Sequence, residues 1–363
     1  GMLYRAMGKH EQAEAVFKEV IAHRTARLGG DDPDTLTSRY WLALVYRSQG
    51  KFDLAEALCR EVLERRSAKL ETNHLDTMAS KQLLAVLAAL KDNHESAEQL
   101  YKEVLKVRTA KQGADHPDTL STRHHLALLY ASMGNPHQAI PMLEETLALR
   151  KTRLSPEHPT TLDTQADLGI NFCNTERQAE GIALLEEVHQ KGLSDRRLVR
   201  VAKILLGAYL HAGKTTDARA LAKELLQAAP HKFDADSLDH FAALADAGWS
   251  LLDFKVYAAA EPLLREALSR GDQHFPDFWR THHARLLLGV ALLGQKKFPD
   301  AEPLLVAGYE GTSDREAQIQ PQSGFPINQA VQWVVKLYES SAQPDKAAEW
   351  RTRLEVLTTR SMQ

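Results

Sequence analysis

The chain has 363 residues, a formal net charge of -3 and 26% charged residues, values that are ordinary for a globular protein. This balance offers no strongly basic face, so nucleic acid is not the expected partner. Cys59 and Cys173 are too few and too far apart for a disulfide framework or a thiolate metal site. No apolar run approaches the roughly 18 residues that span a bilayer, and no secretory signal is present. Together these features predict a cytoplasmic protein without membrane contact.

A repeat of 42 residues begins at the N-terminus and continues through nearly half of the chain. Gly8, Gly50 and Gly134 belong to one ladder of residues at this spacing, in which Asp92 and Glu176 take the remaining places. Three further ladders have the same period: Ala13, Ala55, Ala97, Ala139 and Gly181; Pro33, Leu75, Pro117 and Pro159; and Glu19, Glu61, Glu103, Glu145 and Glu187. Such a period indicates stacked units that cannot bury their faces alone. The sequence therefore predicts a solenoid that presents an extended surface to another molecule.

The first repeat lacks the start of its first helix. Residues 3–8 align one period before residues 45–50, yet the three helical turns that should precede them are absent. Gly1 is typical of a cleavage scar. We therefore expect the chain to be a fragment of a longer protein.

Each complete period reads as a helical hairpin. Apolar residues recur at helical spacing over residues 35–49, Gly50 ends that segment, and residues 54–70 repeat the pattern. The entry Asp32-Pro33-Asp34-Thr35 suits a helix start, because Asp and Thr cap free N–H groups and Pro is tolerated in the first turn. His74, His116 and His158 lie in the equivalent turns, where we expect a structural role.

The run Leu42-Ala43-Leu44-Val45-Tyr46, followed by Gly50-Lys51-Phe52 and Ala55, resembles the tetratricopeptide repeat (TPR). The longer period, with Asp115-His116-Pro117-Asp118-Thr119 between hairpins, resembles the kinesin-light-chain type of this repeat. The resemblance implies an all-α fold, a right-handed superhelical α-solenoid of stacked helical hairpins.

Residues 1–193 form the regular part of the repeat, and its register loosens over residues 194–363. There the turn-to-alanine interval continues in four pairs: Gly213 with Ala218, Lys255 with Ala260, Lys296 with Ala301, and Ala342 with Ala347. We expect degenerate repeats and capping helices that continue the first part as one solenoid. The segments 293–298, 301–305 and 347–351 resemble the C-terminal repeats of bacterial, planctomycete-type serine/threonine kinase-TPR proteins. This resemblance implies a kinase as N-terminal neighbour in the full-length protein.

Motifs for catalysis, cofactors and metals are weak or absent. Gly213-Lys214-Thr215 lacks the spacing and the preceding strand of a phosphate-binding loop. The pairs His124-His125 and His282-His283 are adjacent in sequence, whereas a helical metal site needs two residues four apart. The sequence therefore predicts no enzyme, no cofactor and no metal.

A basic ladder runs along the second helices of the hairpins. Arg24, Arg66, Arg108 and Arg150 are each followed three residues later by Arg27, Lys69, Lys111 and Arg153. Residues three apart share a helix face, so the ladder predicts a basic stripe. The stripe either meets an acidic partner or nucleic acid, or pairs with the Glu19 ladder and with the acidic turns of neighbouring repeats.

In the TPR family the first helix of each hairpin lines the concave surface, which directs attention to first-helix positions not used by packing. The kinesin-light-chain type places Asn pairs there to hold a peptide backbone, and this chain has none. The predicted partner-binding residues are Tyr40, Trp41, Arg47, Gln82, Arg123, His124, His125, Asp163, Asp167, Asn171, Lys203, Asp246 and Trp249. Aromatic and Arg side chains often anchor interfaces, although Trp41 and Trp249 equally suit packing within the stack.

The sequence predicts a non-catalytic protein–protein interaction scaffold that binds a peptide segment or protein partner on its concave surface, as part of a larger signalling protein. The alternative is a structural or self-associating spacer within a multidomain protein. A third interpretation is a module that senses an effector by changing its curvature.

Overall fold

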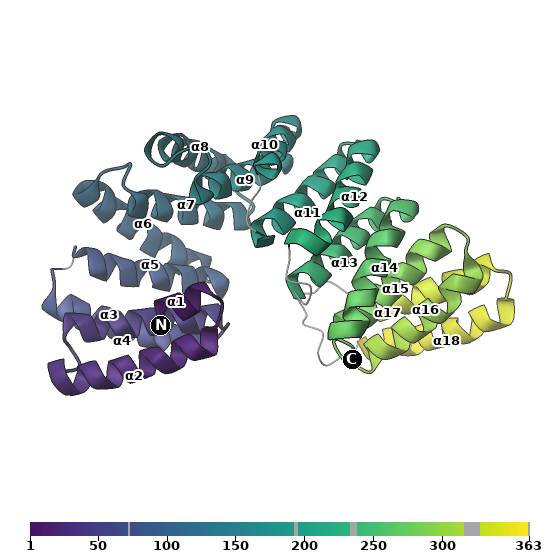
Figure 1. Cartoon of the computed structure of the whole chain (residues 1–363), viewed down its shortest axis with the longest axis horizontal. Coiled ribbons are helices and arrows are strands. Elements are labelled where there is room, and N and C mark those ends of the chain that lie inside the picture. The colour runs from purple at the N-terminus through teal and green to yellow at the C-terminus, as the bar shows by residue number, and fades with distance from the viewer. Residues whose placement is uncertain (72, 192–194, 233–237, 316–326, 362–363) are drawn as a thin grey trace. The chain divides into compact units, whose positions relative to one another are not determined.

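The computed structural model describes residues 1–71, 73–191, 195–232, 238–315 and 327–361, and these residues form α-helices joined by short turns. The chain divides into two compact units, Gly1–Arg177 and Gln178–Gln363 (Figure 1). The all-α fold predicted from the repeat is confirmed. The predicted boundary at residue 193, and the continuity of the two parts as one solenoid, stay predictions.

Helices of the first unit are α1 (Met2–Ala6), α2 (His10–Leu28), α3 (Pro33–Ser48), α4 (Phe52–Lys69), α5 (Leu75–Leu90), α6 (His94–Gln112), α7 (Pro117–Ser132), α8 (Pro136–Arg153) and α9 (Pro159–Cys173). Helices of the second unit are α10 (Gln178–Gln190), α11 (Asp195–His211), α12 (Thr215–Lys232), α13 (Leu238–Asp253), α14 (Tyr257–His274), α15 (Trp279–Gly294), α16 (Phe298–Ser313), α17 (Ile327–Ser340) and α18 (Pro344–Ser361).

Consecutive helices pack as hairpins within each unit, as Figure 1 shows for α3 with α4 and for α15 with α16. The first helices of successive hairpins also contact one another: α3 with α5, α5 with α7, and α7 with α9. In the second unit α11, α13, α15 and α17 do the same. We call these two sets the first-helix layers. The second helices, such as α4 and α6, cover the other side of each hairpin.

The turn inside each hairpin uses the predicted ladder. Gly50 has φ of +73°, a left-handed conformation that glycine adopts without cost. Asp92, Lys255, Lys296 and Ala342 take the place of glycine in other hairpins and keep the same conformation, with φ between 55° and 62°, whereas Glu176 does not adopt it. The repeat geometry therefore overrides the local preference of these residues.

Side chains in the turns between hairpins cap the following helices. The Asp32 carboxylate accepts a hydrogen bond from the Asp34 backbone N–H at 2.9 Å. In the next three repeats the imidazole Nδ1 of His74, His116 and His158 takes the same role. The expected structural role of these histidines is confirmed, and they replace the carboxylate cap of the first complete repeat.

Small residues let the helices of a pair approach closely. Ala43 and Ala85 on the first helices are fully buried, as are Ala55 and Ala97 on the second helices. Larger residues fill the space between repeats at a ladder that includes Cys59, at 0% exposure, and Tyr101, at 2%. Within the described part of the chain, none of the helices combines the length with the apolar character that a membrane span requires.

Candidate partner-binding surface

The arginine ladder of the second helices joins consecutive repeats, and three of its four members are buried. The Arg66 guanidinium of α4 donates to the Asp76 backbone oxygen at 2.8 Å and to the Ser80 hydroxyl at 3.0 Å, both on α5. Arg24, Arg108 and Arg150 bind the equivalent carbonyl and hydroxyl of α3, α7 and α9. Arg66, Arg108 and Arg150 are at most 6% exposed, and this burial lowers their pKa values. The ladder is a series of inter-repeat clamps.

The predicted basic stripe therefore needs correction. Of its two rows, only the second lies at the surface, where Arg153 pairs with Asp115 and Lys69 donates to the Asp31 carbonyl at 3.1 Å. These contacts are the expected ones with acidic turns. The Glu19 ladder pairs elsewhere: Glu145 binds Arg123 of its own hairpin at 2.7 Å. Glu61 and Glu103 pair with Arg39 and Lys81 in the same register.

One column of the predicted site meets the buried arginines. Tyr40, Gln82 and His124 occupy equivalent positions, each 26 residues before an arginine of the clamp ladder. The Arg66 guanidinium lies over the Tyr40 ring at 5.4 Å, and the Gln82 amide oxygen accepts from Arg108. The residues of this column face the repeat junction as well as the first-helix layer.

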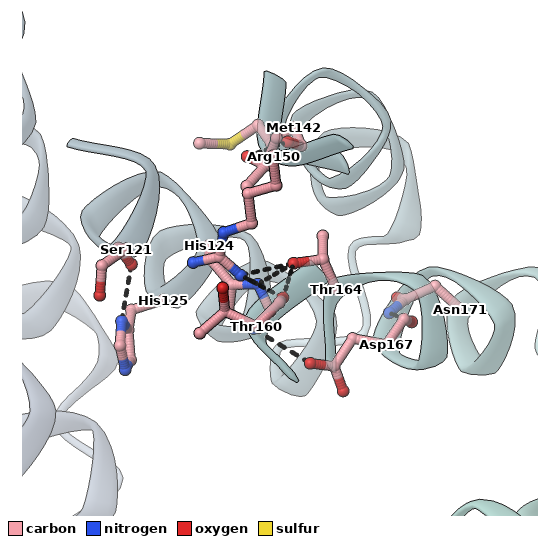
Figure 2. Close-up of polar contacts among 10 residues, drawn as sticks. Ser121, His124, His125, Met142, Arg150, Thr160, Thr164, Asp167 and Asn171 are labelled. Carbon is pink, nitrogen blue, oxygen red and sulfur yellow. Dashed lines mark hydrogen bonds and ion pairs between the residues drawn. The ribbon is translucent and has the colours of Figure 1, made fainter. Parts of the chain in front are cut away.

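His124 is the centre of a buried polar cluster between α7, α8 and α9 (Figure 2). Its Nε2 lies 3.0 Å from the Asp167 carboxylate, and its Nδ1 lies 3.2 Å from the Thr164 hydroxyl. The Arg150 guanidinium lies 3.3 Å from the same Nδ1. His124 is 7% exposed and Asp167 is 3% exposed.

The order carboxylate, imidazole, hydroxyl in this cluster resembles a nucleophilic triad, but the hydroxyl is already engaged. The Thr164 hydroxyl donates to the Thr160 carbonyl at 2.9 Å and accepts from Arg150 at 2.5 Å. Thr164 is fully buried, and Thr122 makes the equivalent contacts one repeat earlier without a neighbouring carboxylate–histidine pair. The cluster therefore holds repeats together.

Four of the predicted residues are more buried than a contact surface requires. Arg123, His124, Asp167 and Asn171 are between 3% and 8% exposed. The Asn171 amide donates to the Asp167 backbone oxygen at 2.8 Å, and Arg123 is held by Glu145. Their side chains contact other residues of the stacked repeats, so the accessible part of the predicted surface is formed by the other residues.

In the first unit the accessible part is formed by Tyr40, Trp41, Arg47, Gln82 and His125, with Asp163 at the equivalent of Ser121. Arg5 lies over the Trp41 ring at 5.4 Å, and His125 stacks on Tyr101 with 6.1 Å between ring centres. Partial burial lowers the pKa of the Arg47 guanidinium and of the His125 imidazole. The Arg47 guanidinium has no hydrogen bond or ion pair among the described residues.

In the second unit the predicted residues lie on α11 and α13. Lys203 and Asp246 form an ion pair at 2.7 Å, which joins these two first helices. Trp249 packs edge-on against His283 of α15, with ring centres 5.0 Å apart. Trp249 also lines a cavity of about 220 Å³.

This cavity lies among the first helices of the second unit. Its lining comes from α13, α15, α17 and the start of α14, and includes Trp249, Trp333, Asp253, Lys255 and Lys336. Burial raises the pKa of the Asp253 carboxyl, against the effect of a hydrogen bond from Trp249. Lys255 and Lys336 are exposed and make no ion pair among the described residues.

Sequence reasoning missed Trp333 and Lys336. Trp333 lies nine residues before the turn residue Ala342, the register that Trp41 has relative to Gly50. Counting back from each turn residue would therefore have placed Trp333 on the same layer. Within the described part of the chain, no group of three or more His, Cys, Asp or Glu side chains is arranged to hold a metal ion.

Stacked helical hairpins with polar and aromatic side chains on the first-helix layers define the class of α-solenoid repeat proteins. The chain belongs to the tetratricopeptide repeat family. A family model described as "Tetratricopeptide repeat" matches residues 1–66, 38–110, 77–152 and 118–190, which together span more than half of the chain. A second model of the same description matches residues 245–315. Proteins of this family are in general non-catalytic scaffolds for protein interactions. A comparison with curated proteins finds no match.

Several solved structures are similar to the chain. BtubC (BKLC) from P. vanneervenii is 19% identical over 59% of this chain and 89% of that one, with a TM-score of 0.51. A Podosopora anserina protein of nearly identical kinesin light chain TPR-like repeats is 26% identical over 52% of this chain and 90% of that one, with a TM-score of 0.45.

A third structure, a signal transduction ATPase with a tetratricopeptide repeat sensor from Pyrococcus horikoshii, has a TM-score of 0.59 at 13% identity. The match covers 97% of this chain and 54% of that one. The similarity to this structure and to BtubC is one of fold.

Proposed function

We propose that the chain is a non-catalytic scaffold that binds a peptide segment or protein partner with its first-helix layers. The observation that carries this proposal is the cavity of about 220 Å³ among α13, α15 and α17. Trp249 and Trp333 supply large, rigid apolar surfaces there, and side chains of this type dominate the binding energy of many interfaces. The ammonium groups of Lys255 and Lys336 stand beside them without ion-pair partners among the described residues.

The first unit supports the proposal through a comparison of its own repeats. Clamp, cap and turn positions keep their roles from repeat to repeat, as the series Arg24, Arg66, Arg108 and Arg150 illustrates. The first-helix position of Arg47 is instead occupied by Ala89, Ala131 and Cys173 in the following repeats. A half-buried guanidinium without an ion pair is costly for a fold and useful for a partner.

The experiment is an affinity capture from the source cells, followed by measurement of Kd for the purified partner. Trp249→Ala and Trp333→Ala remove the two aromatic walls, and Lys223→Ala on α12 is the matched surface control. Loss of an anchoring tryptophan costs about 2 kcal/mol or more, which is roughly a thirtyfold increase in Kd. We expect this loss for both tryptophan variants and an unchanged Kd for the control. Equal affinity of all three proteins would remove the second unit's cavity from the proposal.

Self-association as a spacer is a second candidate, and one observation favours it. Met2, Leu3 and Met7 on and beside α1 are between 55% and 72% exposed, an apolar surface that another copy could cover. Sedimentation velocity over a range of concentrations distinguishes the candidates. A sedimentation coefficient that rises with concentration in the parent, but not in a Leu3→Ser, Met7→Ser variant, would support the spacer.

We also infer that the scaffold serves in the cytoplasm as part of a larger signalling protein with a kinase as N-terminal neighbour. The similarity of residues 293–298 and 301–305 to kinase-TPR proteins supports this inference. An immunoblot of fractionated source cells tests it, because a kinase domain adds far more mass than the 40.6 kDa of the chain itself. A cytoplasmic band at the mass of the chain alone would contradict the kinase neighbour.

A further inference from the structure

One aromatic position of the repeat has a recurring partner. Tyr130 of α7 donates its hydroxyl to Glu98 of α6, the second helix of the preceding hairpin, at 2.9 Å. Tyr209 and Tyr338, four residues before the turn residues of their hairpins, donate to Glu186 and Glu302 at 2.8 and 3.0 Å. In these three hairpins the tyrosine therefore binds a carboxylate of the preceding second helix, whereas Glu14, the equivalent partner of Tyr46, pairs with Lys18 and Lys51 instead.

The third repeat has the carboxylate but lacks the tyrosine. Ala88 occupies the position of Tyr130, and Glu56 precedes it by 32 residues, as Glu98 precedes Tyr130. Glu56 also has the same neighbour along its helix: it pairs with Arg60 at 2.6 Å, as Glu98 pairs with Lys102 at 2.6 Å. Only the phenol ring and its hydroxyl are missing from this arrangement.

A cavity of about 470 Å³ occupies the vacated place between α4, α5 and α6. Its lining includes Glu56, Arg60, Leu63, Leu84, Ala88 and Leu100. Apart from Ala88, each of these residues is the 42-residue equivalent of a residue beside Tyr130's position: Glu98, Lys102, Leu105, Leu126 and Met142. The cavity wall thus repeats the chemistry that surrounds a tyrosine one repeat later.

We propose that this Ala88 pocket receives a tyrosine side chain presented by a partner protein. The ring lies against Leu84 and Leu100, and the hydroxyl donates to the Glu56 carboxylate, as Tyr130 does to Glu98. The pocket opens between second helices, so it is separate from the first-helix layers and does not depend on the function proposed for them.

In the free protein, the Lys91 ammonium binds the Glu56 carboxylate, to which the proposal directs the tyrosine hydroxyl. Its ammonium lies 2.8 Å from Glu56 and 2.7 Å from Asp53. A lysine beside the ring is compatible with tyrosine, because Lys51 lies over Tyr46 at 5.7 Å and Lys346 over Tyr338 at 5.0 Å. Glu302 accepts hydrogen bonds from both Lys346 and Tyr338, so one carboxylate serves both groups. Such a cation adds attraction at the ring face.

The test uses N-acetyl-tyrosinamide as the probe, titrated into the whole chain and followed by NMR of the protein's amide signals. We expect one site, with shifts at Ala88 and Leu100, and at least threefold weaker binding of N-acetyl-phenylalaninamide, which lacks the hydroxyl. Ala88→Tyr should fill the pocket from within and weaken binding at least tenfold. Ala88→Leu is a milder block in case the tyrosine variant misfolds.

Tyr130→Ala is the matched positive control, because it opens a second pocket of the same chemistry beside Glu98. We expect this variant to bind two equivalents of the probe. One equivalent bound at the Glu98 pocket of Tyr130→Ala, with none bound by the parent, would overturn the proposal and show that Lys91 closes the Ala88 pocket. Unchanged affinity of Ala88→Tyr or Ala88→Leu, or equal binding of the two probes, would also overturn it.

Discussion

At the scale of single residues, helical glycines differ in whether a neighbouring helix leaves room for a Cβ atom. A Cβ atom at Gly308 of α16 would lie 2.8 Å from the Leu286 backbone nitrogen and 3.1 Å from the His282 carbonyl of α15. Backbone cannot yield as a flexible side chain does. Gly308→Ala should therefore lower the free energy of unfolding by about 2 to 3 kcal/mol.

Gly207 of α11 is the matched control, because a Cβ there meets nothing within 4 Å. Gly207→Ala should raise the free energy of unfolding by about 0.5 to 1 kcal/mol, since glycine is a poor helix former. Urea titrations followed by circular dichroism measure both changes. A destabilising Gly207→Ala, or a neutral Gly308→Ala, would contradict the packing of these helices.

Buried histidines make the second unit sensitive to acid. Burial lowers the pKa of His283 to about 3 and that of His240 to about 4, and the two residues are 5% and 1% exposed. In the unfolded chain both titrate near a pKa of about 6.5. Above that pH both histidines are neutral in the folded and the unfolded chain, so stability does not depend on their protonation. As the pH falls below it, the unfolded chain binds protons that the folded chain excludes, and stability is lost down to the folded pKa.

At pH 5 the expected loss is about 2 kcal/mol for each histidine relative to pH 7.5. Thermal melts of the parent and of His283→Gln across this range provide the measurement. We expect the variant to lose less stability between the two pH values than the parent does. Parallel pH profiles would mean that His283 is protonated in the folded protein.

At the scale of elements, the buried arginines connect each second helix to the next first helix. Arg108 of α6 donates to the Asp118 carbonyl at 3.0 Å and to the Thr122 hydroxyl at 2.8 Å on α7. Arg108→Ala leaves these groups buried without their donor. We expect a loss of about 3 kcal/mol in the free energy of unfolding.

Lys111 is three residues further along the same helix and belongs to the exposed row. It lies 3.8 Å from Glu71, and both side chains are at least 40% exposed. Lys111→Ala should change stability by at most about 1 kcal/mol. Urea unfolding of the two variants compares the rows directly. Similar losses for both would contradict the assignment of Arg108 as a clamp.

The 42-residue spacing predicted the hairpins, their turns and the small residues at helix contacts. It did not distinguish the buried arginine row from the exposed one, because periodicity identifies a shared helix face but not what that face meets. Arg108 and Lys111 are both basic and three residues apart, yet only the first reaches the next repeat. His124 was likewise predicted on the right helix, whereas its burial depends on Asp167 one repeat later.

At the scale of the whole chain, the regular first unit was easier to predict than the second. Trp249 was found from the sequence, but its companion Trp333 lies beyond the irregular spacing from Lys296 to Ala342. The turn ladder could be followed as far as Ala342, but the first-helix positions that precede each later turn were not counted back from it. Packing of α13, α15 and α17 brings the two tryptophans to one cavity, although they lie six and nine residues before the turn residues of their hairpins.

The central claim is that partners bind the first-helix layers, and site-specific photo-crosslinking in the source cells tests it most directly. A photoreactive phenylalanine analogue replaces Gln329 of α17, which lines the Trp249–Trp333 cavity, or Lys223 of α12, which is exposed on a second helix. We expect a covalent adduct with a partner protein at position 329 and none at 223, and loss of that adduct with Trp249→Ala. Adducts confined to position 223, or absent from both positions, would contradict the claim.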